Sequence, residues 1–151
     1  MGLYGAKISA SPNLDRLSKH FTVFKHSYST APFTVKSEFA LTCGTLDYYT
    51  GPPISSRGEV VNKRCIPNIL SELGYSTSWY HGNDKEYYNR EQFLNQIGFQ
   101  EIKDETYFKE SGLNNELGWG LPDTQLFNYS FKDLANKKKP FYAEILTVSN
   151  H

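Results

Sequence analysis

The spacing of hydrophobic positions along the chain predicts several helices. A helix is expected to begin at Pro12, because Ser11 can cap its first N–H groups and proline has no N–H to leave unpaired there. Two leucines of this helix, Leu14 and Leu17, are expected to face the core. Further helices are predicted over 34–43, 66–73, 90–97 and 123–137, where apolar residues recur at helical intervals and a glycine or proline follows.

Three other segments, 21–28, 75–80 and 141–148, have the aromatic and β-branched composition of strands. Residues 141–148 are almost continuously apolar, which is typical of a strand buried on both faces. The dense glycine and proline of 45–62 predict a loop. Because strands alternate with helices, the fold class is predicted to be α/β, with helices layered on a largely parallel central sheet.

The composition favours a single domain over residues 1–151 and excludes some functions. The 16 Lys and Arg residues balance 16 Asp and Glu residues, so no positive field exists to hold nucleic acid. No apolar run approaches the ~20 residues that span a bilayer, or the core of a secretory signal, so the chain is predicted to be soluble. Its 11 Tyr, 10 Phe and 2 Trp argue against disorder, because they bury surface that offsets chain entropy.

The cysteines, Cys43 and Cys65, allow two interpretations. A disulfide between them would close a loop of about 22 residues, contribute roughly 3 kcal/mol and indicate an oxidising compartment. Two separate buried thiols are the alternative. The pair fits no four-ligand zinc pattern.

Polar residues lie where a parallel sheet binds ligands, beyond the carboxyl ends of its strands. Thr34 begins a predicted helix, where backbone N–H groups stabilise an anion or alkoxide; a plain capping threonine is the alternative. His81 follows one strand and could hold a phosphate or a metal-bound group, or be an ordinary loop histidine. His151 follows another strand. Arg90, two residues after Tyr88, could bind phosphate or sulfate through its guanidinium, or be a solvated arginine at a helix start.

Short motifs occur in a fixed order over almost the whole chain. They are GLYG at 2–5, SPNLD at 11–15, TVKSEF at 34–39, LTCG at 41–44, IPNIL at 66–70, LGY at 73–75, HGN at 81–83, YNR at 88–90, IGF at 97–99, GWGL at 118–121, PFY at 140–142 and SNH at 149–151. On these motifs the sequence resembles the alkaline phosphatase/sulfatase superfamily and, within it, the lipoteichoic acid synthase and phosphoglycerol transferase group. SPNLD is shared across the superfamily, whereas the HGN to NR segment and SNH are specific to the transferase group.

The resemblance implies an alkaline phosphatase-like α/β/α fold, incomplete at both ends, and a metal-dependent enzyme. In that family a threonine attacks a phosphodiester or phospholipid headgroup, forms a phosphothreonine and passes the group to an acceptor hydroxyl or water. Thr34 matches this nucleophile, which is also a metal ligand. Arg90 and His151 match positions that bind the substrate phosphate, and His81 and Tyr88 match positions that line the pocket. The metal (manganese, magnesium or zinc) would lower the hydroxyl pKa and neutralise phosphoryl charge.

The family's other metal ligands, an acidic residue upstream of GLYG and a downstream Asp-His pair, have no counterpart in the chain. The chain is therefore expected to be the amino-terminal and central part of a catalytic domain. Because catalytic sites use about three protein ligands, it is expected to bind metal poorly and to be inactive alone. Sulfatases in the strict sense need a C/S-x-P-x-R motif, which Cys43 lacks, so sulfate ester hydrolysis is disfavoured.

Several functions remain open at this point. The first is transfer of a phosphoglycerol or phosphoethanolamine headgroup from a phospholipid donor to a glycan or polyol acceptor, or phosphodiester hydrolysis. The second is a non-catalytic module that binds anionic lipid headgroups or glycans, and the third is a structural remnant without a ligand. The resemblance implies a parent protein that is anchored in the membrane and has its catalytic domain outside the cytoplasm, in agreement with a Cys43–Cys65 disulfide. An exposed sheet edge favours self-association.

Overall fold

A parallel sheet forms the centre of the molecule. The computed structural model describes residues 1–47, 50–53, 57, 62–113 and 118–149. The sheet has three strands in the order β2-β1-β3, and both neighbouring pairs are parallel. The strands are β1 (Ser76–His81), β2 (Glu101–Lys103) and β3 (Phe141–Leu146). This arrangement confirms the predicted α/β class with a parallel sheet.

Helices precede and separate the strands along the chain. They are η1 (Gly2–Tyr4), α1 (Pro12–Leu17), α2 (Thr34–Cys43), α3 (Ile66–Glu72), η3 (Tyr87–Asn89), α4 (Arg90–Gln96), α5 (Glu105–Glu110) and α6 (Asp123–Ala135). The helices predicted to begin at residues 12, 34, 66, 90 and 123 are confirmed. Helix α5 and strand β2 were not predicted, because segments of 6 and 3 residues are too short to show a hydrophobic period.

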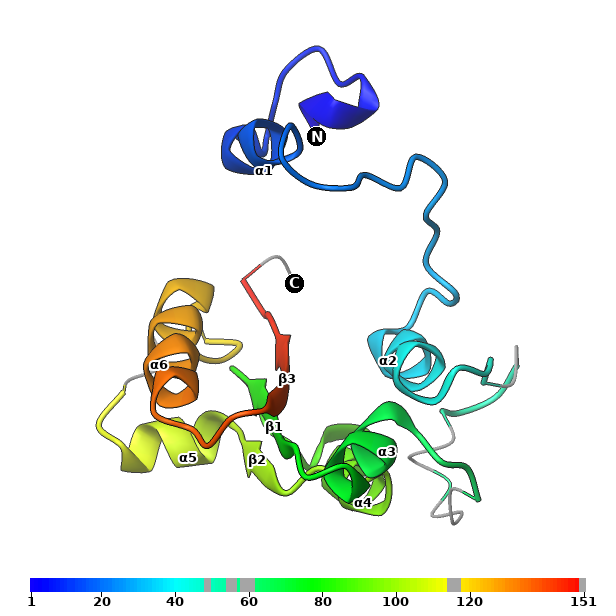
Figure 1. The fold of residues 1–151 in the computed structure, drawn as a ribbon, viewed down its shortest axis with the longest axis vertical. Helices are drawn as coiled ribbons and strands as arrows, with labels where there is room; N and C mark the ends of the chain where they lie inside the picture. The colour runs from blue at the N-terminus through cyan, green and yellow to red at the C-terminus, as the bar shows by residue number, and fades with distance from the viewer. Residues whose placement is uncertain (48–49, 54–56, 58–61, 114–117, 150–151) are drawn as a thin grey trace.

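Helices cover both faces of the sheet, so the layers are α/β/α (Figure 1). Successive residues of a strand point to opposite faces, and the central strand shows this with Trp79 and Tyr80. Trp79 packs with apolar residues of α2, α4 and the start of α3. Tyr80 packs on the other face with residues of α5 and α6. Both aromatic side chains are 0% exposed, so β1 is the centre of two hydrophobic clusters.

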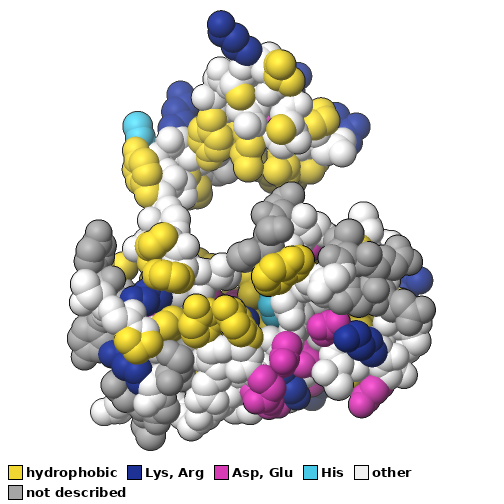
Figure 2. Space-filling view, turned by 180° about the vertical axis from the view of Figure 1, so that it is seen from behind, with side chains coloured by type: hydrophobic (Ala, Val, Ile, Leu, Met, Phe, Trp, Pro, Cys, Tyr) yellow, Lys and Arg dark blue, Asp and Glu magenta, His cyan; other side chains and the backbone are white. Residues whose placement is uncertain are grey.

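The N-terminal part of the chain corrects two predictions. Residues 21–28 form no strand, because in the described part of the chain no strand lies beside them to complete a ladder. Leu14 and Leu17 do not face a core: they are 50% and 42% exposed. Figure 1 shows η1 and α1 apart from the sheet, joined to α2 by an extended segment, and Figure 2 shows hydrophobic side chains on the surface of this part. Amphipathic spacing alone does not say whether a partner surface is present.

The predicted burial of the last strand is also corrected. Residues 141–148 were expected to be buried on both faces, but every residue of β3 is only partly buried. The reason is its place at an edge of the sheet, since β3 pairs with β1 on one side only. The strand ends at Leu146, and Val148 beyond it is buried.

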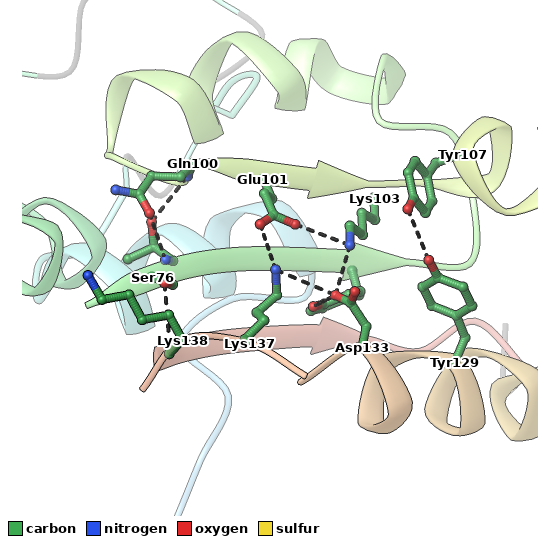
Figure 3. A network of polar contacts seen from close by, with 11 residues as sticks. Ser76, Gln100, Glu101, Lys103, Tyr107, Tyr129, Asp133, Lys137 and Lys138 are labelled. Atoms are coloured by element: carbon green, nitrogen blue, oxygen red, sulfur yellow. Dashed lines mark hydrogen bonds and ion pairs between the residues drawn. The ribbon is translucent and has the colours of Figure 1, made fainter. Parts of the chain in front are cut away.

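A network of ion pairs connects α6 and the residues just after it to the sheet, on the face of the sheet that carries Tyr80 (Figure 3). Lys103 of β2 lies 2.8 Å from Asp133 and 3.1 Å from Glu101, and Lys137 lies 2.6 Å from Glu101. The Lys103 ammonium also lies 5.1 Å from the Tyr107 ring. These contacts offset the burial of Lys103, which is 8% exposed, and raise its pKa. None of the helices in the described part of the chain is both long and apolar enough to cross a membrane.

Candidate active site

Thr34 is the first residue of α2 and its side chain is exposed. Phe33 occupies the capping position in an extended conformation, with φ −104° and ψ 129°. Phe33, and not Thr34, is therefore the capping residue of α2, so the interpretation of Thr34 as a plain capping threonine is wrong. The Thr34 hydroxyl lies at a helix end whose first N–H groups have no partner within the helix, which is a favourable place for an anion.

The buried stripe of α2 carries a carboxylate. Val35, Glu38, Phe39 and Thr42 follow the i, i+3, i+4, i+7 pattern and all four are buried. Glu38 accepts a hydrogen bond from the Trp79 indole N–H at 2.7 Å. Because Glu38 lies four residues after Thr34, both side chains are on the same side of the helix.

Arg90 completes this cluster from α4. Its Nε donates to Glu38 at 3.0 Å, and its guanidinium lies 5.6 Å from the centroid of the Trp79 ring. Arg90 is 3% exposed, so the structure excludes the alternative of a solvated arginine at a helix start. Burial raises the pKa of Glu38, while the charge of Arg90 and the hydrogen bond from Trp79 oppose that rise.

The turn before Arg90 has an uncommon backbone conformation. Tyr88 and Asn89 have φ values of 59° and 55°, the left-handed region that large side chains rarely adopt. Such conformations cost energy and cluster at functional sites. The rings of Tyr87 and Tyr88 contact each other, with centroids 4.4 Å apart. The turn thus places a partly buried tyrosine two residues before the buried arginine.

His81 is the last residue of β1 and lies at the carboxyl edge of the sheet. Its Nδ1 is 2.9 Å from the Leu146 carbonyl oxygen, and its ring centroid is 5.2 Å from that of Trp79. The next residue, Gly82, leaves no room for a side chain, because an added Cβ would lie 2.7 Å from the Leu121 carbonyl oxygen. This close approach packs residues 118–121 against the end of β1.

A second carboxylate lies beneath α2 on the same face of the sheet. Glu144 of β3 pairs in register with Trp79 and accepts hydrogen bonds from Tyr142 at 2.5 Å and Thr42 at 3.2 Å. Burial raises the pKa of Glu144, and the nearby charge of Glu38 raises it further. The Glu38 carboxylate, in contrast, has a cation beside it.

The segment after β3 is tied to the start of α6. The Asp123 carboxylate accepts hydrogen bonds from the N–H groups of Val148 and Ser149 at 2.7 and 3.1 Å. The hydroxyl of Ser149 accepts from the Asp123 N–H at 3.0 Å. His151, proposed from the sequence as a phosphate ligand, lies outside the described residues.

Cys43 and Cys65 form a disulfide that joins the end of α2 to the capping residue of α3. The bridge fixes the carboxyl end of the helix that begins with Thr34.

The structure therefore brings Arg90 and His81 to one side of the sheet, both in contact with Trp79, with Thr34 one turn from Glu38. Sequence reasoning missed Glu38 and Trp79. A charged residue in the buried stripe of α2 is the signal that could have identified Glu38. Among the described residues, no group of three or more His, Cys, Asp or Glu side chains could hold a metal ion. The residues described here thus do not by themselves form the metal site that the resemblance implies.

Comparison with known proteins agrees with this arrangement. The profile of the family described as Sulfatase matches residues 1–151. The chain belongs to the sulfatase family. It is 31% identical over 148 residues to the lipoteichoic acid synthase of Staphylococcus saprophyticus, a match that covers 93% of this chain and 22% of that protein. It is 34% identical over 87 residues to lipoteichoic acid synthase 1 of Bacillus subtilis, which covers 57% of this chain and 14% of that protein.

Solved structures of this sulfatase-family fold are similar as well. A lipoteichoic acid synthase from Listeria monocytogenes superimposes with a TM-score of 0.82 at 25% identity, over 93% of this chain and 35% of that one. An alkaline phosphatase superfamily protein from Vibrio parahaemolyticus gives a TM-score of 0.78 at 27% identity, with the same coverage. These matches confirm the resemblance to lipoteichoic acid synthases and the alkaline phosphatase-like fold. The chain spans about a fifth of the length of the curated relatives that match most of it (22%).

Proposed function

We propose that these residues form part of the catalytic domain of a metal-dependent transferase that moves a phosphoglycerol or phosphoethanolamine headgroup, or of a related phosphodiester hydrolase, with Thr34 as the nucleophile. The observation that carries the proposal is the cluster in which Glu38 joins the helix of Thr34 to Arg90 and Trp79. The likeness to lipoteichoic acid synthases supports an extracytoplasmic enzyme with a phospholipid donor such as phosphatidylglycerol and a glycolipid or polyol acceptor.

The reaction consists of two phosphoryl transfers. The Thr34 oxygen forms a bond to phosphorus as the bond between phosphorus and the oxygen of diacylglycerol breaks, and diacylglycerol leaves with the proton of the hydroxyl. An acceptor hydroxyl, or water, then attacks the phosphothreonine, and the proton that it loses returns to Thr34. N–H groups at the start of α2 face the charge that develops on the phosphoryl oxygens.

Arg90 binds the phosphate in this proposal, and Tyr88 and His81 shape the pocket, with His151 as a second phosphate ligand. A bidentate guanidinium fits two phosphate oxygens, which aligns the phosphorus for attack. A divalent metal, when bound, would lower the pKa of the threonine hydroxyl and neutralise phosphoryl charge. This chain contributes Thr34 to that metal, the other ligands lie outside it, and these 151 residues alone are expected to be inactive.

Loss of turnover on removal of one hydroxyl tests the proposal. The complete gene product is incubated with manganese and a phosphatidylglycerol analogue, and release of diacylglycerol is followed. Thr34→Ala is expected to lower turnover on the order of 10³-fold or more. Thr30→Ala, which removes another exposed hydroxyl shortly before α2, is the matched control and is expected to keep full activity. Undiminished turnover by Thr34→Ala would contradict Thr34 as the nucleophile, whereas no turnover by the unmutated protein would favour the binding module.

A further inference from the structure

Glu38 occupies a position where a charge is costly. Its side chain is 7% exposed, and an ionised carboxylate is tolerated at such a depth only if it is paired and hydrogen-bonded. Both of its oxygens are engaged: Oε1 accepts from the Trp79 indole at 2.7 Å, and Oε2 accepts from Nε of Arg90 at 3.0 Å. An apolar residue would pack in the same stripe of α2 without this cost, so the carboxylate indicates a task beyond packing.

The contacts of Arg90 restrict the direction of its guanidinium. This group has five N–H donors in a planar fork, and within the described residues only Nε donates a hydrogen bond, to Glu38. Neither terminal amino group has a hydrogen-bond partner among the described residues, and each keeps slight contact with solvent, although the side chain as a whole is only 4% exposed. The Trp79 ring, 5.6 Å away, supports one side of the guanidinium. The fork is thus held at Nε and by the ring, while its terminal amino groups have no protein partner among the described residues.

We infer that Glu38 is a positioning residue: it orients the Arg90 guanidinium so that both terminal amino groups bind the substrate phosphate about one helical turn from the Thr34 hydroxyl. Glu38 and Thr34 are four residues apart in α2, a distance of roughly 6 Å along the helix axis. The same carboxylate therefore sets the place of the phosphate ligand relative to the nucleophile. The inference rests on the proposed function, because it gives Arg90 a phosphate to bind.

Two roles for Glu38 predict opposite effects of removing its charge. If its carboxylate acted only as a negative charge near the site, its neutralisation would strengthen the binding of a phosphate. If the carboxylate orients the guanidinium, its neutralisation weakens binding, because the fork loses its fixed direction. A purely structural role would lower the folded fraction, and hence kcat, without changing KM.

Phosphate binding in a variant that cannot turn over separates these roles. In the complete gene product carrying Thr34→Ala, titration calorimetry measures the affinity for inorganic phosphate and for glycerol phosphate. Adding Glu38→Gln is expected to weaken the binding of both about tenfold, and Glu38→Asp less, since it keeps the charge on a shorter stem. Adding Arg90→Ala instead is expected to weaken phosphate binding at least as much. The variant that carries both Arg90→Ala and Glu38→Gln is expected to bind phosphate no more weakly than Arg90→Ala alone.

The matched control is Glu144→Gln, which neutralises a partly buried carboxylate on the same face of the sheet, in register with Trp79, and is expected to leave phosphate affinity unchanged. With Thr34 present, Glu38→Gln is expected to raise KM for the lipid donor. Equal or tighter phosphate binding by folded Glu38→Gln, or effects of Glu38→Gln and Arg90→Ala that simply add, would overturn the inference. If Glu38→Gln does not fold, an unchanged phosphate affinity of the Glu38→Asp variant would overturn the inference instead. Turnover by Thr34→Ala, in contrast, would overturn the proposed function alone.

Discussion

Replacing Arg90 by methionine is expected to destabilise the protein by an amount that depends on pH. The substitution keeps most of the buried volume but leaves the Glu38 carboxylate without its cation. At 3.0 Å and an effective dielectric constant near 20, the pair has a Coulomb energy of ~5 kcal/mol. The unpaired carboxylate avoids this loss by taking up a proton. From a usual pKa of 4.5, protonation at pH 7 costs about 3.4 kcal/mol, and at pH 5 about 0.7 kcal/mol.

Protonation is cheaper than the lost Coulomb energy, so it sets the upper limit on the destabilisation. The sign follows from linkage: Arg90→Met raises the folded-state pKa of Glu38 further, so the variant loses stability as pH rises above about 4.5. Because burial already raises this pKa in the wild type, the expected difference stays below the limits of about 3.4 kcal/mol at pH 7 and about 0.7 kcal/mol at pH 5. Urea unfolding of both proteins at the two pH values measures it. Adding Glu38→Gln to Arg90→Met should abolish the pH dependence of this destabilisation. An equal destabilisation by Arg90→Met at pH 5 and pH 7 would show that protonation of Glu38 does not limit its cost.

Three further predictions concern the disulfide, the charged network and the second carboxylate. Replacing Cys43 and Cys65 by serine should lower the free energy of unfolding by roughly 3 kcal/mol, since the bridge closes a loop of 22 residues; unchanged urea midpoints would contradict this. Lys103→Met should cost about 1 kcal/mol, because Glu101 and Asp133 then share Lys137 as their cation, whereas Lys109→Met, at a more exposed helix pair, should cost less than about 0.5 kcal/mol in the same assay. Glu144 has a raised pKa in the folded protein, so its stabilising effect is present at low pH and is lost as pH rises above about 4.5. The Glu144→Gln variant should therefore gain stability relative to the wild type as pH rises from 4 to 8. If the unfolding free energies of the two proteins change in parallel with pH, this prediction is wrong.

The predictability of each element follows from where its determining contacts lie in the sequence. Helix α2 was predictable because Val35 and Phe39 lie on one side of the helix and Gly44, with φ 63°, ends it; all of this information is local. The failed strand at 21–28 has a suitable composition, but a strand also needs a neighbour, and composition does not reveal one. The edge position of β3 likewise depends on the order of strands in the sheet, which a single segment does not contain.

The candidate site was predictable only in part for a similar reason. Thr34 and Arg90 were proposed from their places at predicted helix starts and from motifs in a fixed order that match a known family. Glu38 lies within one of those motifs, yet its partner Arg90 is 52 residues later, and nothing in the spacing shows that the two side chains meet. The burial of Arg90 came from the structure as well, since an arginine at a helix start is usually solvated.

Covalent phosphorylation of Thr34 during turnover can be detected by mass spectrometry of the intact protein. The complete gene product is incubated with manganese and a phosphatidylglycerol or phosphatidylethanolamine analogue, quenched in acid, and its intact mass and peptide map are measured. We expect an adduct with the mass of the phosphorylated headgroup on Thr34, absent from Thr34→Ala and present in Thr30→Ala. A folded protein that turns over the analogue with no adduct on Thr34, or that carries the adduct on another residue, would contradict the assignment of Thr34 as the nucleophile.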